Sequence, residues 1–208
     1  MKYRLAIFDV DSTLIEQEVI DLLAAHTPYG SQVADITARA MAGELEFDDA
    51  LKERVALLKD LPSTIFTQVL EEISFSQGAE ELLSTLKNSG YFVGVVSGGF
   101  HNILDELFSK FHLDFLRANT LEVIDEQLTG RTLGPIVNRE GKARALREFA
   151  DSYQVPLMQC VAVGDGSNDL DMVELAGLGV SYRGKPILNA AANVVITDPG
   201  LEQLLKYL

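Results

Sequence analysis

The chain has 208 residues and a formal net charge of −14, from 31 acidic and 17 basic side chains. This length suits one α/β domain with a smaller inserted one, and the acidic balance argues against nucleic acid or an anionic membrane surface as a partner. Hydrophobic residues make up 47% of the chain and the mean hydropathy is +0.12, as expected of a soluble globular protein with an ample core.

Short apolar runs alternate with longer stretches of helical spacing along most of the chain. Several runs are apolar on both faces, which is typical of parallel strands that helices cover on both sides. The expected strands are residues 3–8, 91–97, 160–164, 178–182 and 193–197, and the expected helices are residues 79–90, 100–111, 141–153 and 168–177. The alternation predicts an α/β fold built on a doubly wound parallel sheet of the Rossmann-like type.

Two segments depart from this alternation. Residues 16–75 contain three or four helical patterns and no convincing strand, so we expect a small helical cap inserted after the first strand. Residues 116–138 contain short β-like pieces, which predict a strand followed by a small hairpin near 120–137. The predicted domains are therefore a catalytic core of residues 1–15 and 76–208 and a helical cap of residues 16–75.

Residues with catalytic or binding chemistry follow three of the predicted strands. They are Asp9 and Asp11 after the first strand, Ser97, Gly98 and Gly99 after the second, and Asp165, Gly166, Asn168 and Asp169 after the run at 160–164. Ligands of doubly wound sheets bind beyond the carboxyl ends of the strands, and the amides of a strand-to-helix turn favour an anion. Carboxylate oxygens are the ligands that Mg²⁺ prefers. The pattern therefore indicates a cation and a phosphate, with Lys142 as a second positive charge.

Each of these motifs alone has an ordinary structural explanation. An Asp-x-Asp pair is common in turns, "SGG" and "GDGSND" are typical of loops, and a lysine such as Lys142 is most often a solvated helix residue. The order of the motifs is more informative, because an acidic pair, a hydroxyl, a lysine and a second acidic pair each come at a predicted strand end or helix start. That order favours a site for a phosphate and a cation.

The segments "FDVDSTLI", "VVSGGF", "GKARAL" and "VGDGSNDLDM" resemble the four ordered motifs of the haloacid dehalogenase superfamily, and the resemblance covers essentially the whole chain. Within the superfamily the sequence is similar to the phosphoserine phosphatases, through "DSTLIEQEVID", "MAGELEFDDALKERVALLKDLP" and "ANTLEVIDEQLTG". The resemblance implies Mg²⁺-dependent hydrolysis of O-phospho-L-serine, the last step of serine biosynthesis. Some members carry an N-terminal regulatory domain, which we do not expect here because the first predicted strand begins at residue 3.

The resemblance also implies roles for the acidic residues. Asp9 would be the nucleophile that attacks phosphorus to give an aspartyl-phosphate, and Asp11 would be the general acid and base. One Mg²⁺ would be held by the Asp9 side chain, the Asp11 backbone carbonyl and the Asp165 side chain. Because several carboxylates share one small site, a raised pKa is expected for one of them.

Further residues are implied in holding the phosphoryl oxygens as charge redistributes during transfer. These phosphate-binding residues are Ser97, Gly98, Lys142 and Asn168. Asp169 would support the metal or the lysine without contacting the substrate.

The helical segment is expected to bind the rest of the substrate. Glu18 stands among the apolar positions of the helix predicted after Asp11, where a carboxylate needs a cationic partner such as a ligand ammonium group. Phe47 and Arg54 lie seven residues apart, on one face of a helix, and Arg54 would bind a carboxylate with two hydrogen bonds. Met41 and Phe47 would form an apolar lid. Ordinary explanations stay open, namely a solvated ion pair for Arg54 and plain core packing for Met41 and Phe47.

Three other functions fit parts of the pattern. The nearest is a phosphatase of the same fold that acts on another small phosphomonoester or on phosphohomoserine. A dehalogenase would need an aspartate nucleophile but no second acid, so Asp11 argues against it. A non-enzymatic phospho-receiver module also has acidic clusters and a lysine on a parallel sheet. Such a module is generally smaller and accepts phosphate after a later strand, so the Asp-x-Asp of the first strand and the inserted helices argue against it.

The expected partner is a small phosphorylated amino acid, with neither nucleic acid nor a membrane, and the expected assembly is a monomer or a homodimer. The apolar run near the N-terminus is too short for a signal peptide, and no stretch approaches about 18 uninterrupted apolar residues. Cys160 is the only cysteine, which excludes an internal disulfide and favours a reducing cytoplasm. Because its neighbours are apolar, we expect Cys160 to be a core residue. The scattered histidines His26, His101 and His112 receive no role.

Overall fold

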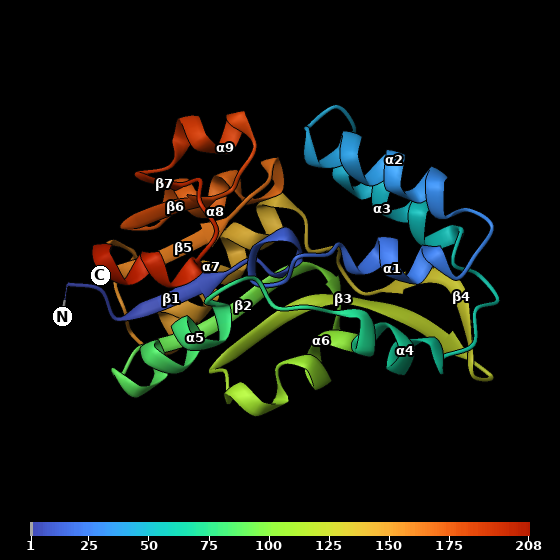
Figure 1. Ribbon diagram of the computed structural model, residues 1–208, viewed down its shortest axis with the longest axis horizontal. Coiled ribbons are helices and arrows are strands. Elements are labelled where there is room, and N and C mark those ends of the chain that lie inside the picture. Colours follow the sequence, from blue (N-terminus) through green and yellow to red (C-terminus); the bar gives the residue numbers. More distant parts are fainter. Residues whose placement is uncertain (1) are drawn as a thin grey trace.

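Seven strands form one sheet in the order β4-β3-β2-β1-β5-β6-β7 (Figure 1). The computed structural model describes residues 2–208, apart from the side chain of Met41. The strands are β1 (Leu5–Phe8), β2 (Phe92–Phe100), β3 (Phe115–Ile124), β4 (Gln127–Leu133), β5 (Cys160–Gly164), β6 (Leu178–Tyr182) and β7 (Val194–Ile196). Neighbouring strands run parallel except β3 and β4, which are antiparallel. The prediction of a doubly wound, mostly parallel α/β sheet is therefore confirmed.

Helices cover both faces of the sheet because its central strands are apolar on both faces. Along β1, Ala6 and Phe8 lie in the core on one face, and Leu5 and Ile7 lie in the core on the other. The first core is completed by α5 (Ala79–Asn88) and α6 (His101–Leu107), and the second by α7 (Arg139–Ser152), α8 (Leu170–Leu175) and α9 (Pro186–Ala191). Cys160 is buried in the second core, where burial raises the pKa of its thiol to about 11, as expected of a core residue.

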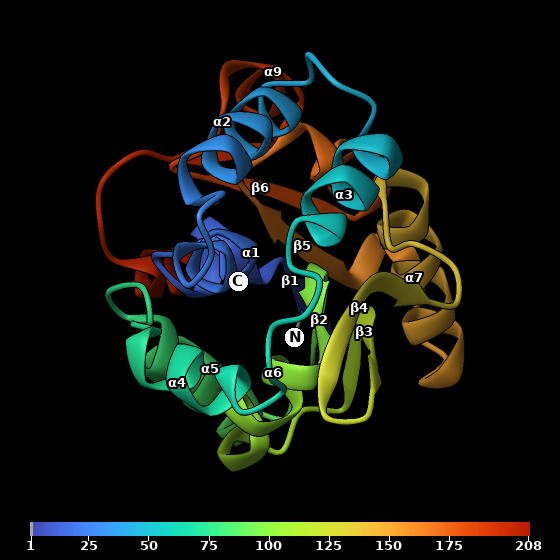
Figure 2. The ribbon, with the colours of Figure 1, turned by 90° about the vertical axis from the view of Figure 1, so that its right-hand side faces the viewer.

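Four α-helices occupy the chain between β1 and α5, which confirms the helical content predicted there. They are α1 (Val19–Ala25), α2 (Gly30–Met41), α3 (Phe47–Ala56) and α4 (Ile65–Glu72). Figures 1 and 2 show that α1, α2 and α3 lie beyond the end of the sheet at which β1 finishes. Ligands of doubly wound sheets bind at this end, so these helices lie next to the expected site. Whether residues 16–75 act as a separate cap stays a prediction.

The hairpin predicted near residues 120–137 is present, because β3 and β4 pair antiparallel from Thr120 with Leu133 to Ile124 with Gln127. The strand predicted before it is the first part of β3, which pairs with β2 and continues into the first arm of the hairpin. The turn between the two arms consists of Asp125 and Glu126, with φ angles of 51° and 60°. A two-residue turn of this kind joins two antiparallel strands directly.

Two predicted helices are shorter than expected. The helix predicted at 100–111 ends as α6 at Leu107 and is followed by a 3-10 turn at Ser109–Phe111, and His112 then takes a left-handed conformation with φ of 49°. The helix predicted at 168–177 begins as α8 at Leu170, after a 3-10 turn. Among residues 2–208, no helix combines the length and the apolar composition that a membrane span requires.

Candidate active site

The strands β1, β2 and β5 are neighbours in the sheet, so their carboxyl ends lie at one edge. Asp9 directly follows β1, Ser97 lies near the end of β2, and Asp165 directly follows β5. All three residues are buried, with exposed fractions of 1%, 0% and 4%. Buried carboxylates are costly unless they are paired or hydrogen-bonded, so the contacts around them decide what this edge can do.

Lys142 supplies a positive charge between the carboxylates of Asp9 and Asp169. It lies in the first turn of α7, is fully buried, and its Nζ is 2.7 Å from Asp9 Oδ1 and 2.7 Å from Asp169 Oδ1. Burial alone would lower the pKa of Lys142, but the charges of Asp169 and Asp9 together outweigh burial and raise it. The lysine therefore stays protonated and ties α7 to the loops after β1 and β5.

Asp169 anchors the loop after β5 to this lysine. Its Oδ2 accepts hydrogen bonds from the backbone amides of Asp165 and Gly166, at 3.1 and 3.0 Å, while its Oδ1 contacts Lys142. The carboxylate lies so close to Gly164 that a Cβ atom at that position would be 2.3 Å from Asp169 Cγ. Glycine at 164 is therefore required by this close approach, and both oxygens of Asp169 already have partners within the protein.

The Asp11 carboxylate is held between β2 and the start of α1. Its Oδ1 accepts from the backbone amide of Val19 at 2.7 Å, and its Oδ2 accepts from Ser97 Oγ at 2.9 Å. Burial raises the pKa of Asp11, although these two hydrogen bonds and the charges of Lys142 and Arg54 hold it down. The hydroxyl of Ser97 thus donates to Asp11 in this structure instead of pointing freely into the pocket.

The carboxylates of Asp9, Asp165 and Asp169 form a group that can hold a metal ion, since one oxygen of each lies within 4.8 Å of the others. Burial, and next the charge of Asp169, raises the pKa of Asp9 well above its usual range, and the same two causes raise the pKa of Asp165 to about 7. Asn168 Oδ1 is buried beside them without a hydrogen-bond partner among the described residues. This set of oxygen donors fits a hard divalent cation. Asp9 and Asp165 are the better ligands, because both oxygens of Asp169 are occupied.

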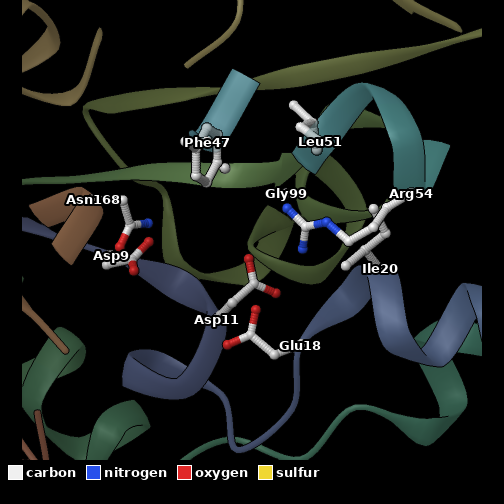
Figure 3. Close-up of a pocket in the computed structure, with 10 residues that line it drawn as sticks. Asp9, Asp11, Glu18, Ile20, Phe47, Leu51, Arg54, Gly99 and Asn168 are labelled. Atoms are coloured by element: carbon white, nitrogen blue, oxygen red, sulfur yellow. The ribbon is translucent and has the colours of Figure 1, made fainter. Parts of the chain in front are cut away.

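A pocket with an empty volume of about 380 Å³ opens between this edge of the sheet and helices α1 and α3 (Figure 3). It is lined by Asp9, Asp11, Glu18, Ile20, Phe47, Leu51, Arg54, Gly98, Gly99 and Asn168. In Figure 3, Asp9 and Asn168 lie at one end, Arg54 and Ile20 lie at the other, and Asp11 lies between them. The Phe47 ring covers Gly98 so closely that a Cβ atom there would be 2.7 Å from the ring.

Arg54 carries the positive charge at the far end of the pocket. It is 4% exposed, its Nε donates to the Ala50 carbonyl at 3.1 Å, and its Nη1 donates to Thr37 Oγ1 at 3.0 Å. Thr37 Oγ1 lies 2.7 Å from Asp21 Oδ1, to which it donates. Among the described residues, no carboxylate lies within 4.0 Å of the guanidinium. A buried cation without a carboxylate partner favours an anionic ligand.

Sequence reasoning missed Thr37, although a signal was present. The apolar stripe of α2 contains Val33, Ile36 and Ala40, and Thr37 occupies a position of that stripe. A threonine at a core position of an amphipathic helix needs a hydrogen-bond partner, which here is provided by Arg54 and Asp21. The pattern could therefore have indicated a buried polar contact, but it could not have named the partner.

The prediction that Glu18 lies within a helix is wrong, although the residue lines the pocket. Glu18 is the residue before α1 and has extended backbone angles, and Ile15 just before it forms a bridge with Phe75. Glu18 Oε1 accepts from Ser12 Oγ at 2.6 Å. Burial, and next the charge of Asp11, raises the pKa of Glu18 to about 8. The extended chain, and not a helix face, brings this carboxylate into the pocket.

The structure brings together most residues that the sequence singled out. Those that line the pocket or hydrogen-bond to a residue lining it are Asp9, Asp11, Glu18, Phe47, Arg54, Ser97, Gly98, Lys142 and Asn168. Asp165 and Asp169 adjoin them in the acidic group. The predicted lid residue Met41 ends α2, and its side chain lies outside the described part of the structure.

The sequence model of the haloacid dehalogenase-like hydrolases matches residues 6–174. The chain belongs to this family. Within it, the chain groups with the phosphoserine phosphatases, since it is 47% identical over 204 residues to the phosphoserine phosphatase of Streptococcus thermophilus, a match that covers 98% of this chain and 95% of that protein. The resemblance predicted from the motifs is thus confirmed.

Other relatives of this haloacid dehalogenase-like hydrolase are longer. The phosphoserine phosphatase of Streptomyces coelicolor is 51% identical over 205 residues, which are 99% of this chain and 50% of that protein. The chain spans about half the length of this relative and of the Mycobacterium tuberculosis relative. Among solved structures, a substrate-bound phosphoserine phosphatase complex has a TM-score of 0.96 at 40% identity, covering 100% of this chain and 99% of that one. A phospho-aspartyl intermediate analogue of phosphoserine phosphatase has a TM-score of 0.95 at 40% identity and covers 100% of both chains.

The contacts of Thr37 predict a cost to stability when its hydroxyl is removed. Thr37→Val keeps the shape but removes the hydrogen-bond partner of Arg54 Nη1 and of Asp21 Oδ1, so we expect a loss of about 1–3 kcal/mol in the free energy of unfolding. Thr37→Ser, which keeps the hydroxyl, is the matched control and should cost less. Urea denaturation of the three proteins measures the difference. Equal unfolding free energies for the valine and serine variants would contradict the role given to the hydroxyl.

The buried acids predict that the metal-free protein loses stability as the pH rises. The pKa of Asp165 is raised to about 7 and that of Glu18 to about 8, whereas in the unfolded chain both titrate near about 4. Between these values the folded state binds more protons than the unfolded state, so the free energy of unfolding falls with increasing pH, by up to about 1.4 kcal/mol per pH unit for each proton.

Chemical denaturation in the presence of a chelator, at intervals from pH 5 to pH 8, measures this slope. Asp165→Asn should make the slope shallower, and the same change at the exposed residue Asp198 should leave it unaltered. A stability that stays flat or rises over this interval would contradict the assignment of protonated acids to the site.

Proposed function

We propose that this chain hydrolyses O-phospho-L-serine to L-serine and phosphate, with Mg²⁺ as its cofactor and an aspartyl-phosphate as intermediate. The observation that carries the proposal is the distribution of charge along one pocket. Acidic oxygens beside a buried lysine lie at one end, and the buried Arg54, with Glu18 nearby, lies toward the other. A ligand with a phosphate, a carboxylate and an ammonium group complements this distribution. The names of the relatives and of the similar structures support the same substrate.

The first chemical step follows from the contacts of Asp9. Its Oδ1 accepts from the Val10 amide at 2.8 Å and contacts Lys142 at 2.7 Å, so Oδ2 is the candidate oxygen for in-line attack on phosphorus. The bond from phosphorus to the serine oxygen breaks as the bond to Asp9 forms. Asp11 then gives its proton to the departing oxygen, and its raised pKa suits a group that is protonated when the substrate binds.

The second step returns the enzyme to its starting state. Asp11, now a carboxylate, takes a proton from a water molecule, whose oxygen attacks phosphorus and releases Asp9. Lys142 and the backbone amide of Gly98 stabilise the negative charge on the phosphoryl oxygens in both steps. Ser97 contributes a donor once its hydroxyl turns away from Asp11, to which it donates in the structure.

The proposed ligands of Mg²⁺ are the side chains of Asp9 and Asp165 and the backbone carbonyl of Asp11. When bound, the ion offsets the negative charge of the acids and of the phosphate, and it orients the phosphate. Asp169 keeps its proposed supporting position because its oxygens hold Lys142 and two amides. The donor set and the orphaned Asn168 Oδ1 support a cation at this place.

The helical segment of residues 16–75 is the proposed cap that reads the amino-acid part of the substrate. Arg54 would bind the carboxylate and Glu18 the ammonium group, while Phe47 excludes water from above Gly98. Met41 is proposed as a second apolar lid residue on the resemblance alone. The cytoplasm as location and a monomer or homodimer as assembly stay predictions of the sequence.

A kinetic comparison of two substrates tests the proposal. Arg54→Ala should reduce kcat/KM for phosphoserine by at least about tenfold, because truncating one partner of a desolvated charge pair costs about 2–5 kcal/mol. Glu18→Gln should reduce it less strongly, since the amide still accepts a hydrogen bond. Neither variant should much affect an aryl phosphate, which has no carboxylate or ammonium group. Asp9→Asn should abolish turnover of both substrates and serves as the matched control for the chemistry.

Two results would contradict the proposal. Equal losses on both substrates for Arg54→Ala would mean that Arg54 supports the fold or the phosphate site, and the case for an amino-acid substrate would lose its physical basis. Faster release of phosphate by the wild-type chain from phosphohomoserine, a sugar phosphate or a nucleotide than from phosphoserine would favour another phosphomonoester as the natural substrate.

A further inference from the structure

The position of α3 determines the geometry of the pocket. This helix carries Phe47 at its first position and Arg54 in its last turn, and both line the pocket. Opposite them, Lys142 is fully buried and Asp9 is 1% exposed. A substrate that bridges the two sides therefore depends on how α3 is held relative to α7, the helix that carries Lys142.

The two ends of α3 contact different segments outside residues 16–75. Its C-terminal end lies on the β3–β4 hairpin, where a Cβ atom on Gly130 would be 3.3 Å from the backbone of Ala56. Its N-terminal end meets Asn138, whose Nδ2 donates to Asp48 Oδ1 at 2.9 Å. Figure 2 shows α3 above the hairpin and next to α7. The Asn138–Asp48 bond therefore holds the end of α3 at which Phe47 lies.

Asn138 is also the N-cap residue of α7. Its Oδ1 accepts from the Gly141 amide at 2.9 Å, and its backbone carbonyl accepts from the Lys142 amide at 2.8 Å. One side chain thus caps the helix of Lys142 with its oxygen and holds α3 with its nitrogen. Asparagine is suited to both contacts. An aspartate at this position would also cap the helix, but it would offer no donor to Asp48.

A longer side-chain hydrogen bond joins α2 to the loop after β5. Ser167 Oγ lies 3.4 Å from the Ala40 carbonyl at the end of α2. Within residues 2–208 and apart from the Met41 side chain, these two are the side-chain hydrogen bonds that join α2 and α3 to the loops after the strands. The shorter bond, from Asn138, is the one that reaches α3 itself.

We propose that Asn138 is a positioning residue that sets the Arg54 helix against the Lys142 helix through its hydrogen bond to Asp48. This bond keeps Arg54 and Lys142 at the separation that a phosphorylated amino acid requires. The inference therefore rests on the proposed function, which names that substrate. Asn138 is not among the residues that line the pocket. It acts on catalysis and specificity through the relative placement of α3 and α7.

An exchange of the two side chains tests the proposal. Asn138→Asp keeps the oxygen that caps α7 but removes the donor and brings a second carboxylate against Asp48. Asp48→Asn alone keeps an acceptor for Asn138 and is the matched control. In the double variant N138D/D48N the hydrogen bond forms in reverse, from the new amide at 48 to the new carboxylate at 138. The double variant and Asn138→Asp both carry a negative charge at position 138. If the double variant regains activity, the loss in Asn138→Asp is not a direct effect of that charge on Lys142.

The kinetic readout is the ratio of kcat/KM for phosphoserine to kcat/KM for an aryl phosphate. Asn138→Asp should lower kcat/KM for phosphoserine by about tenfold, mainly through a higher KM, and change that for an aryl phosphate by less than about threefold. Asp48→Asn and the double variant should both stay within about threefold of the wild type on phosphoserine. An unaltered Asn138→Asp variant, equal losses on both substrates, or a double variant no better than Asn138→Asp would overturn the proposal.

Amide hydrogen exchange separates this proposal from the proposed function. Asn138→Asp should speed exchange in residues 47–56 and leave residues 139–152 protected, and the double variant should restore the slow exchange. If the wild-type chain releases no phosphate from phosphoserine but this exchange pattern is found, the proposed function fails and the coupling of α3 to α7 stands. If exchange in residues 47–56 does not change, the coupling is refuted whatever the substrate.

Discussion

The ion pairs of the buried Lys142 hold the site together. Its ammonium group lies between Asp9 and Asp169, and through these two residues it joins α7 to the loops after β1 and β5. A buried charge without partners would cost several kcal/mol, so none of the three side chains is stable in this position without the others. The geometry of the nucleophile candidate is thus fixed by a lysine more than one hundred residues away along the chain.

This network leaves an excess of negative charge, which defines what the site can bind. Lys142 offsets part of the charge of the acids, and burial together with the charge of Asp169 raises the pKa values of Asp9 and Asp165, which favours their protonated forms when no cation is bound. A divalent cation relieves the same charge without protons. At the far end of the pocket the sign is opposite, because Arg54 is buried without a carboxylate partner among the described residues. A single ligand that spans both ends must itself carry groups of both kinds.

The sequence was sufficient to predict the sheet and the acidic edge, because both follow from short-range rules. Apolar runs predict parallel strands, and residues directly after such strands, such as Asp9 and Asp165, must lie at one edge. Glu18 was predicted to lie on a helix face, but α1 begins at Val19. Glu18 reaches the pocket because the chain before α1 is extended. The β3–β4 hairpin was predicted near residues 120–137, but no local pattern indicates that its first arm continues the strand that pairs with β2. Thr37 and Asn138 were missed because their partners are distant in sequence, and pairing across such distances leaves no local pattern.

Calorimetric titration of Mg²⁺ into protein stripped with a chelator tests the central claim, that the charge of the buried acids is completed by a divalent cation held by Asp9 and Asp165. The account predicts one saturable site per chain, lost in Asp165→Asn and retained in Glu18→Gln, since Glu18 lies outside the acidic group. Binding that Asp165→Asn leaves unchanged, or no saturable binding in the wild-type chain, would contradict it.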